Sequence, residues 1–76
     1  MKKVQIINDL KQMIKESSFD YSYDEIAIRE LFNNYTDTLC KDNMISEDFY
    51  NRIILTDTEL KSLLKVADNV SEYRDY

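Results

Sequence analysis

The residues that could take part in recognition chemistry are carboxylates, and they are concentrated in one stretch of the chain. Between Glu16 and Asp48 the sequence has nine acidic residues and two basic ones, whereas the fifteen residues before Glu16 have four lysines and one aspartate. A surface that carries one sign of charge attracts partners of the opposite sign and steers their association. We therefore expect this acidic stretch to face a basic partner protein.

Ten residues of the stretch and its tyrosine-rich link are candidates for partner contact. Glu30 and Asp37 are the strongest, because they lie in the middle of an expected helix, point outward and have no local structural role. Asp24, Glu25, Glu47 and Asp48 lie in first helical turns, where a carboxylate also stabilises the helix. Tyrosine is enriched at protein interfaces, because it combines a large contact area with a polar tip. The candidates are Asp20, Tyr21, Tyr23, Asp24, Glu25, Glu30, Asp37, Asp42, Glu47 and Asp48.

Catalytic chemistry is not expected from this sequence. The chain has no histidine, which is the usual general acid or base near neutral pH, and its one cysteine therefore lacks an imidazole partner. It also has no glycine, so no glycine-rich loop can bind phosphate. Zinc-type sites need histidine or several cysteines, and no segment has calcium-hand spacing. We expect a protein that is not an enzyme and that needs no metal or other cofactor.

Helices are expected to position these side chains. The absence of glycine and proline disfavours tight hairpin turns and removes the main helix breakers. Apolar residues at helical spacing predict a first helix over residues 3–16, with a short strand over residues 3–7 as the alternative. Ser22 and Glu25 have the spacing of a capping box, and Tyr21 and Ile26 that of a hydrophobic staple, so a second helix is predicted from Ser22.

The second helix is expected to end near Lys41, followed by a turn in which Asn43 takes a left-handed conformation. A third, short helix is predicted from Ser46 to Leu55. A fourth begins at Thr56, whose capping-box partner is Glu59, and extends to about residue 73. These patterns predict one all-α domain over residues 1–76, a small bundle of three to four helices with short polar links.

Length and composition limit the remaining possibilities. A chain of 76 residues buries too little surface for a very stable monomer. The apolar faces of its predicted helices are also larger than a bundle with one short helix can cover. A homodimer is therefore expected. The single cysteine, Cys40, excludes an internal disulfide and is typical of a reducing cytoplasm. No signal peptide is recognisable, and no apolar run approaches the ~18 residues that cross a membrane.

Two other function classes remain open. The helices expected at residues 46–55 and 56–73 are joined with almost no loop, as in a helix-turn-helix, so a small DNA-binding transcriptional regulator is one alternative. Lys61 and Lys65 would be its main phosphate contacts. Since the net charge is −5 and nucleic-acid affinity depends on phosphate neutralisation, direct nucleic-acid binding is not our expectation. A homodimeric helical adaptor or assembly protein is the other alternative.

The chain resembles a known class of proteins in its small size, its helical pattern, its acidic stretch from Glu16 to Asp48 and its lack of catalytic residues. This class is the small acidic proteins with which phages and mobile elements block host factors, and some of its members act as DNA mimics. The resemblance covers composition over the whole chain and includes no specific motif. It implies a non-enzymatic inhibitor that acts in the host cytoplasm on a basic host protein. Host proteins that bind nucleic acid are one class of target that the resemblance implies.

Overall fold

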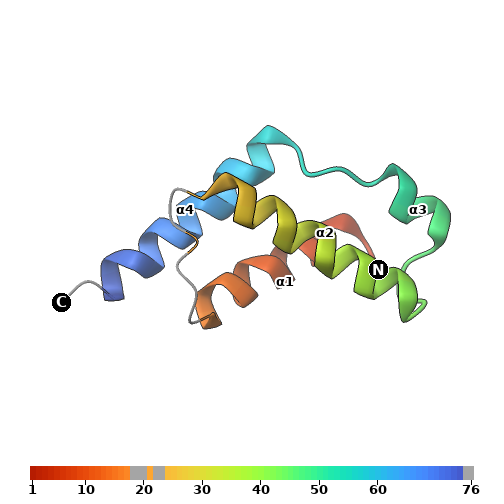
Figure 1. Cartoon of the computed structure of the whole chain (residues 1–76), viewed down its shortest axis with the longest axis horizontal. Helices are drawn as coiled ribbons and strands as arrows, with labels where there is room; N and C mark the ends of the chain where they lie inside the picture. The colour runs from red at the N-terminus through yellow and green to blue at the C-terminus, as the bar shows by residue number, and fades with distance from the viewer. Residues whose placement is uncertain (18–20, 22–23, 75–76) are drawn as a thin grey trace.

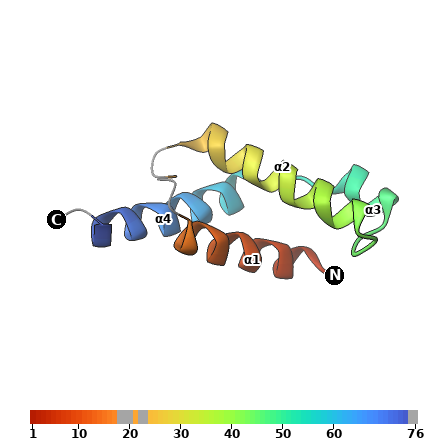
Figure 2. The same ribbon diagram turned by 60° about the horizontal axis from the view of Figure 1, so that its bottom comes forward.

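Four α-helices make up the fold, in the order α1 (Lys3–Glu16), α2 (Glu25–Lys41), α3 (Glu47–Arg52) and α4 (Asp57–Arg74). The computed structural model describes residues 1–17, 21 and 24–74, the side chains among these extending to residue 69. The described residues contain no strand, so the predicted all-α class is confirmed. In Figure 1, α1 and α4 run in the same direction and α2 runs in the opposite direction, and the view in Figure 2 agrees.

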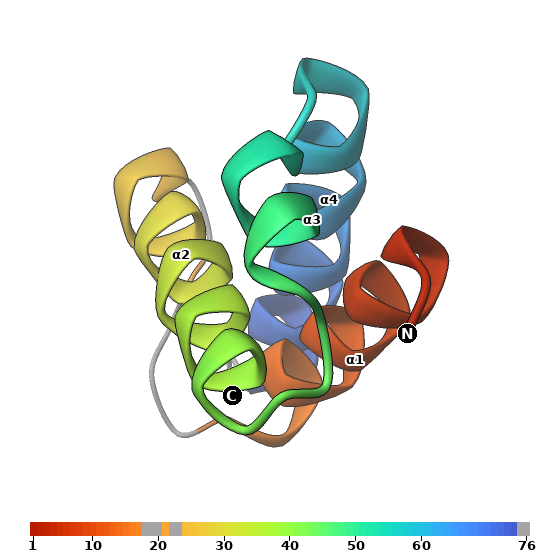
Figure 3. The same cartoon turned by 90° about the vertical axis from the view of Figure 1, so that its right-hand side faces the viewer.

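The core lies where the apolar faces of α1, α2 and α4 meet. Figure 3, viewed from the end that carries α3, shows α4 between α2 and α1. Ile6, Leu10, Ile28 and Leu63 are completely buried there. These residues belong to the stripes predicted from sequence, and burying each such side chain contributes about 1.5–3 kcal/mol. The three long helices therefore form the stable body, and the six-residue α3 packs only on α2 within the described part of the chain.

Several predicted helix boundaries are confirmed by their hydrogen bonds. The first helix spans Lys3–Glu16, and no strand forms at its start. Ser46 caps α3 by accepting a hydrogen bond from the Phe49 amide. At the start of α4, the Thr56 amide donates to Glu59 Oε1 over 2.9 Å, and the Glu59 amide donates to Thr56 Oγ1 over 3.3 Å. Asn43 has φ 59°, the left-handed conformation predicted for the turn after α2.

The predicted end of the third helix was wrong. The helix ends at Arg52 instead of Leu55, and Ile53 already has the extended angles φ −72° and ψ 132°. The next helix has its cap at Thr56, and a cap residue has non-helical backbone angles, so the two helices cannot be continuous. The segment from Ile53 to Thr56 crosses from α3 to the start of α4 (Figure 1) and buries Leu55, whereas Ile54 stays 66 % exposed.

The predicted start of the second helix was also displaced. The helix begins at Glu25, and its N-cap is Asp24, whose Oδ1 accepts a 2.9 Å hydrogen bond from the Ala27 amide. The Asp24 amide donates a 3.2 Å hydrogen bond to the Tyr21 carbonyl. Ser22, the predicted cap, lies outside the described residues. Ile26 is 72 % exposed, so it does not form the predicted staple with Tyr21.

Candidate functional site

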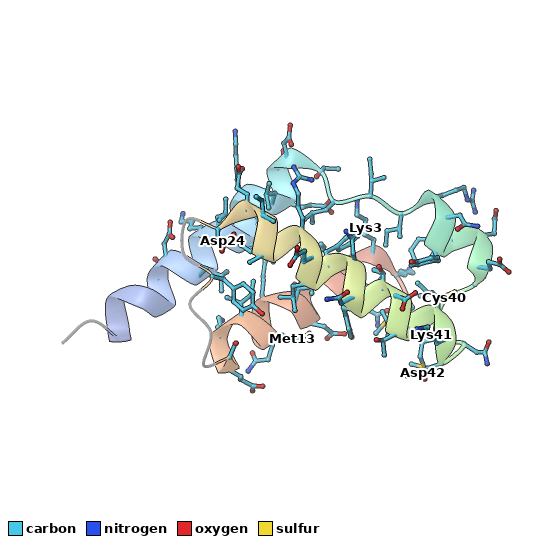
Figure 4. All side chains as sticks on the ribbon, viewed as in Figure 1. Lys3, Met13, Asp24, Cys40, Lys41 and Asp42 are labelled. Carbon is cyan, nitrogen blue, oxygen red and sulfur yellow. The ribbon has the colours of Figure 1, made fainter. Side chains whose placement is uncertain are left out.

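The candidate surface is the outer side of α2, the turn after it and the start of α3. Figure 4 shows Asp24 at the beginning of α2 and Asp42 at its end, so the predicted carboxylates span the whole helix. Seven of the predicted contact residues are carboxylates in the described part of this region: Asp24, Glu25, Glu30, Asp37, Asp42, Glu47 and Asp48. The basic residues between Asp24 and Asp48 are Arg29 and Lys41, and Arg52 follows at the end of α3.

Asp37 does not have the unpaired character that the sequence indicated. One of its oxygens lies 3.0 Å from Lys41 Nζ, and the other accepts a 3.4 Å hydrogen bond from the Tyr50 hydroxyl. The carboxylate raises the pKa of Lys41, first through the hydrogen bond and then through charge attraction. Because Tyr50 belongs to α3, Asp37 connects α2 to α3. It therefore has the local role that the sequence-based interpretation denied it.

Two further carboxylates have local roles. Asp24 is the N-cap of α2. Asp48 lies in the first turn of α3, and its Oδ2 is 2.6 Å from an Arg52 guanidinium nitrogen one turn later. This pair is strongly exposed, and exposed pairs one helical turn apart contribute only about 0.3–0.5 kcal/mol. The positive charge of Arg52 compensates the negative charge of Asp48, which the sequence analysis had counted among those that attract a partner.

The remaining carboxylates are the ones available to a partner. Their side chains are exposed, and they make no ion pair or hydrogen bond with any part of the chain that the structure describes. These residues, called the free carboxylates below, are Glu25, Glu30, Asp42 and Glu47. Glu25 and Glu30 lie in the first half of α2, Asp42 directly follows the helix, and Glu47 lies in the first turn of α3.

The tyrosine-rich link is only partly described. Tyr21 is half-buried and packs against the hydrophobic core, so it covers part of the core as well as bordering the surface. Asp20 and Tyr23 lie outside the described residues.

Two hollows flank the outer side of α2. One has a volume of about 210 Å³ and is lined by Tyr21, Ala27, Glu30, Leu31 and Asn34. The other, of about 240 Å³, lies between α2 and the extended segment, with Arg29, Phe32, Asn33, Ile53, Ile54 and Leu55 in its walls. Successive residues of a helix are about 100° apart around its axis, which places the two sets of α2 residues on opposite flanks. The free carboxylate Glu30 belongs to the first hollow.

The positive charge lies mostly on other helices. Six of the seven lysines, all except Lys41, are on α1, on its N-cap or on α4. Lys3 is partly buried against α4, where its Nζ is 2.8 Å from Glu59 Oε1. The α2–α3 side is therefore acidic relative to the α1 side, and the separation of charge follows the fold as well as the sequence.

No group of three or more metal-ligating side chains occurs among residues 1–17, 21 and 24–69, and none of the described helices is long and apolar enough to cross a membrane. The two helices considered for DNA binding are separated by the extended residues 53–56, because α3 ends at Arg52, and α3 does not pack on α4 in the described part of the chain. Comparison with protein-family models, curated proteins and solved structures found no match to this chain.

Sequence reasoning missed the apolar part of this surface. Ala27 and Leu31 form one i, i+4 row on α2, and Glu30 and Asn34 form the neighbouring row, so the helical spacing could have shown that apolar and polar rows adjoin. The contribution of Tyr21 to the hollow is a tertiary contact, which local spacing does not encode. Ile54 was expected in a helical face and instead borders the second hollow.

Proposed function

We propose that the protein is a non-enzymatic binding protein that engages a basic partner through the free carboxylates. The observation that supports this proposal is that Glu25, Glu30, Asp42 and Glu47 are exposed and make no ion pair with the described chain, although lysines are present on the other helices. Carboxylates that form no ion pair leave their charge uncompensated for a partner, and attraction between oppositely charged surfaces accelerates and orients association.

The class of partner follows from the resemblance to small acidic inhibitors. The free carboxylates extend from the first turn of α2 to the first turn of α3, and α2 alone, with seventeen residues of about 1.5 Å each, is about 25 Å long. These carboxylates have the charge that a basic nucleic-acid-binding site recognises. The protein would inhibit a host protein of this kind in the cytoplasm by occupying that site in the manner of a DNA mimic.

A binding measurement with purified bacterial nucleoid proteins tests the proposal. At low salt we expect at least one of them to bind this protein and to be displaced by duplex DNA. Affinity should decrease between 50 and 300 mM salt, because the screening length is about 10 Å at 0.1 M. Biolayer interferometry at several salt concentrations would measure both effects.

The matched variants are Glu30→Lys and Glu16→Lys, which change the net charge equally. Glu30 is a free carboxylate of α2, whereas Glu16 lies at the end of α1, where it accepts a hydrogen bond from Gln12. We expect Glu30→Lys to weaken binding by about tenfold, a change of about 1.4 kcal/mol, and Glu16→Lys to change it much less. Equal effects of the two variants would show that only net charge matters and would contradict a localised surface.

A further inference from the structure

The hollow beside Tyr21 combines an apolar wall with a carboxylate. Ala27 and Leu31 come from one row of α2, Glu30 and Asn34 from the neighbouring row, and Tyr21 closes the hollow from the link. Ala27, Leu31 and Tyr21 are half-buried, whereas Glu30 and Asn34 are exposed. The hollow therefore has apolar and aromatic surface inside and polar groups at its edge.

This combination suits a long cationic side chain better than any other protein group. The methylene stem of an arginine or lysine can lie along apolar surface while its charged end reaches polar groups. A carboxylate attracts the charge, and an amide oxygen accepts a hydrogen bond from it. A tyrosine ring adds attraction for a cation within about 6 Å of its centre. An apolar side chain would leave the Glu30 and Asn34 groups unused.

Arginine fits the hollow better than lysine. Its planar guanidinium stacks on aromatic rings and can donate two parallel hydrogen bonds to one carboxylate, whereas the lysine ammonium is a compact, strongly hydrated charge. The volume of about 210 Å³ is sufficient for a single side chain of this kind and not for a folded segment.

The second hollow lacks these properties. Its charged residue is Arg29, which lies 3.6 Å from Asp57, and no carboxylate lines it. A cationic side chain would meet like charge there. Charge complementarity therefore distinguishes the two flanks of α2, although both have apolar walls.

We propose that the hollow lined by Tyr21, Ala27, Glu30, Leu31 and Asn34 binds an arginine side chain of the basic partner. The inference rests on the proposed function and deepens it, because it names one residue type that the partner must present. Glu30 is the specificity-determining group, and the free carboxylates outside the hollow attract the partner without selecting arginine over lysine.

The first test uses small probes in an NMR titration of the ¹⁵N-labelled full chain. Nα-acetyl-arginine amide should shift the backbone amide signals of Ala27, Glu30, Leu31 and Asn34 in a saturable way at millimolar concentration. The matching citrulline amide, which has nearly the same shape without the charge, should produce no saturable shift. Equal shifts with citrulline, or shifts confined to other helices, would overturn the proposal.

The second test uses octa-arginine and octa-lysine peptides with Glu30→Gln and Glu47→Gln variants, measured by calorimetry at low salt. Each variant removes one exposed charge, but only Glu30 lines the hollow. We expect wild-type protein to bind octa-arginine more tightly than octa-lysine. Glu30→Gln should lose about tenfold in octa-arginine affinity and the preference with it, and Glu47→Gln should lose less than about threefold.

The outcomes separate this inference from the proposed function. Equal losses in the two variants would overturn the arginine site and leave the acidic surface intact. Equal binding of the two wild-type peptides would also overturn arginine as the occupant. Failure of wild-type protein to bind either peptide would overturn both the site and the proposed function. Thermal melting should change little in either variant, since neither side chain has a bonding partner in the described structure and the first-turn position of Glu47 contributes at most about 1 kcal/mol.

Discussion

The hydroxyl of Tyr35 donates a 2.6 Å hydrogen bond to Oδ2 of Asp9 and so connects α2 to α1. The two residues are 26 positions apart in sequence, and the pair lies partly buried beside the core. Burial, followed by the hydrogen bond and the negative charge of Asp9, raises the pKa of Tyr35 to about 12 from the ordinary value of 10.0. All three causes favour the neutral phenol in the folded protein.

The first prediction concerns alkaline stability. The unfolded chain releases the Tyr35 proton near pH 10, whereas the folded chain keeps it until about pH 12. The stabilisation from this group is therefore complete below pH 10 and is lost as the pH rises toward 12. Tyr35→Phe should lower the free energy of unfolding by about 1 kcal/mol at pH 8 and have less effect at pH 11. Urea unfolding followed by circular dichroism at several pH values measures the difference between the two proteins.

Tyr50→Phe is the control for this experiment, because the Tyr50 hydroxyl donates a longer hydrogen bond of 3.4 Å to Asp37. A constant difference between wild-type protein and Tyr35→Phe from pH 8 to pH 11 would contradict the predicted linkage.

The second prediction concerns acid stability. Burial by itself would raise the pKa of Glu59, but hydrogen bonds from Lys3 and Thr56 and the charge of Lys3 outweigh it and lower the pKa below the ordinary 4.5. Its stabilisation is therefore present above pH 4.5 and is lost as the pH falls through the lower pKa of the folded state. Lys3→Met should reduce stability by up to about 1 kcal/mol at pH 7 and by less at pH 3.

Arg52→Met provides the comparison, because the Asp48–Arg52 pair is far more exposed than the Lys3–Glu59 pair. Urea unfolding at pH 3, 5 and 7 should show a much smaller change for Arg52→Met. An equal pH-dependent loss in both variants would indicate general charge effects instead of the specific Lys3–Glu59 contact.

The third prediction separates Asp37 from Glu30. Asp37 contacts Lys41 and Tyr50, whereas Glu30 has no bonding partner in the described residues. Asp37→Ala should therefore increase amide hydrogen exchange in α3, because the helix loses a connection to α2, and Glu30→Ala should not. The energetic effect should stay below about 1 kcal/mol, since the contact is partly exposed. Hydrogen exchange measured by mass spectrometry would distinguish them, and identical α3 protection in the two variants would argue against the connection.

The helices were predictable because their signals are local. The apolar spacing from Ile6 to Ile14 and the capping pair Thr56–Glu59 lie within a few turns of one helix, so their geometry follows from helical periodicity alone. Asn43 was identifiable for a similar reason, since asparagine tolerates the left-handed conformation better than most residues.

Charge pairing between helices was not predictable. Lys41 lies one helical turn after Asp37, so that pair could be predicted from sequence, whereas Tyr50 meets Asp37 only because α3 folds back onto α2. The contacts Asp9–Tyr35 and Lys3–Glu59 likewise depend on how the helices pack. The contact between Asp37 and Tyr50 therefore required the tertiary structure, as did the contribution of Tyr21 to the hollow.

The last prediction concerns Asp24, which the sequence offered as a partner contact and the structure shows to be the N-cap of α2. The cap predicted from sequence was Ser22, two residues earlier, but the hydrogen bond from the Ala27 amide identifies Asp24 as the N-cap. Asp24→Ala should lower the free energy of unfolding by about 1 kcal/mol, whereas Asp24→Asn should change it little, because asparagine caps as well as aspartate. Glu25→Ala, beside the cap, should have a smaller effect.

Thermal and urea unfolding measure the stability of these variants, and octa-arginine binding to Asp24→Asn measures the effect of the charge separately. Since the cap holds the first turn that carries Ala27, we expect Asp24→Asn to keep the hollow and to lose less octa-arginine affinity than Glu30→Gln. A larger loss would identify Asp24 as a direct contact as well as a cap.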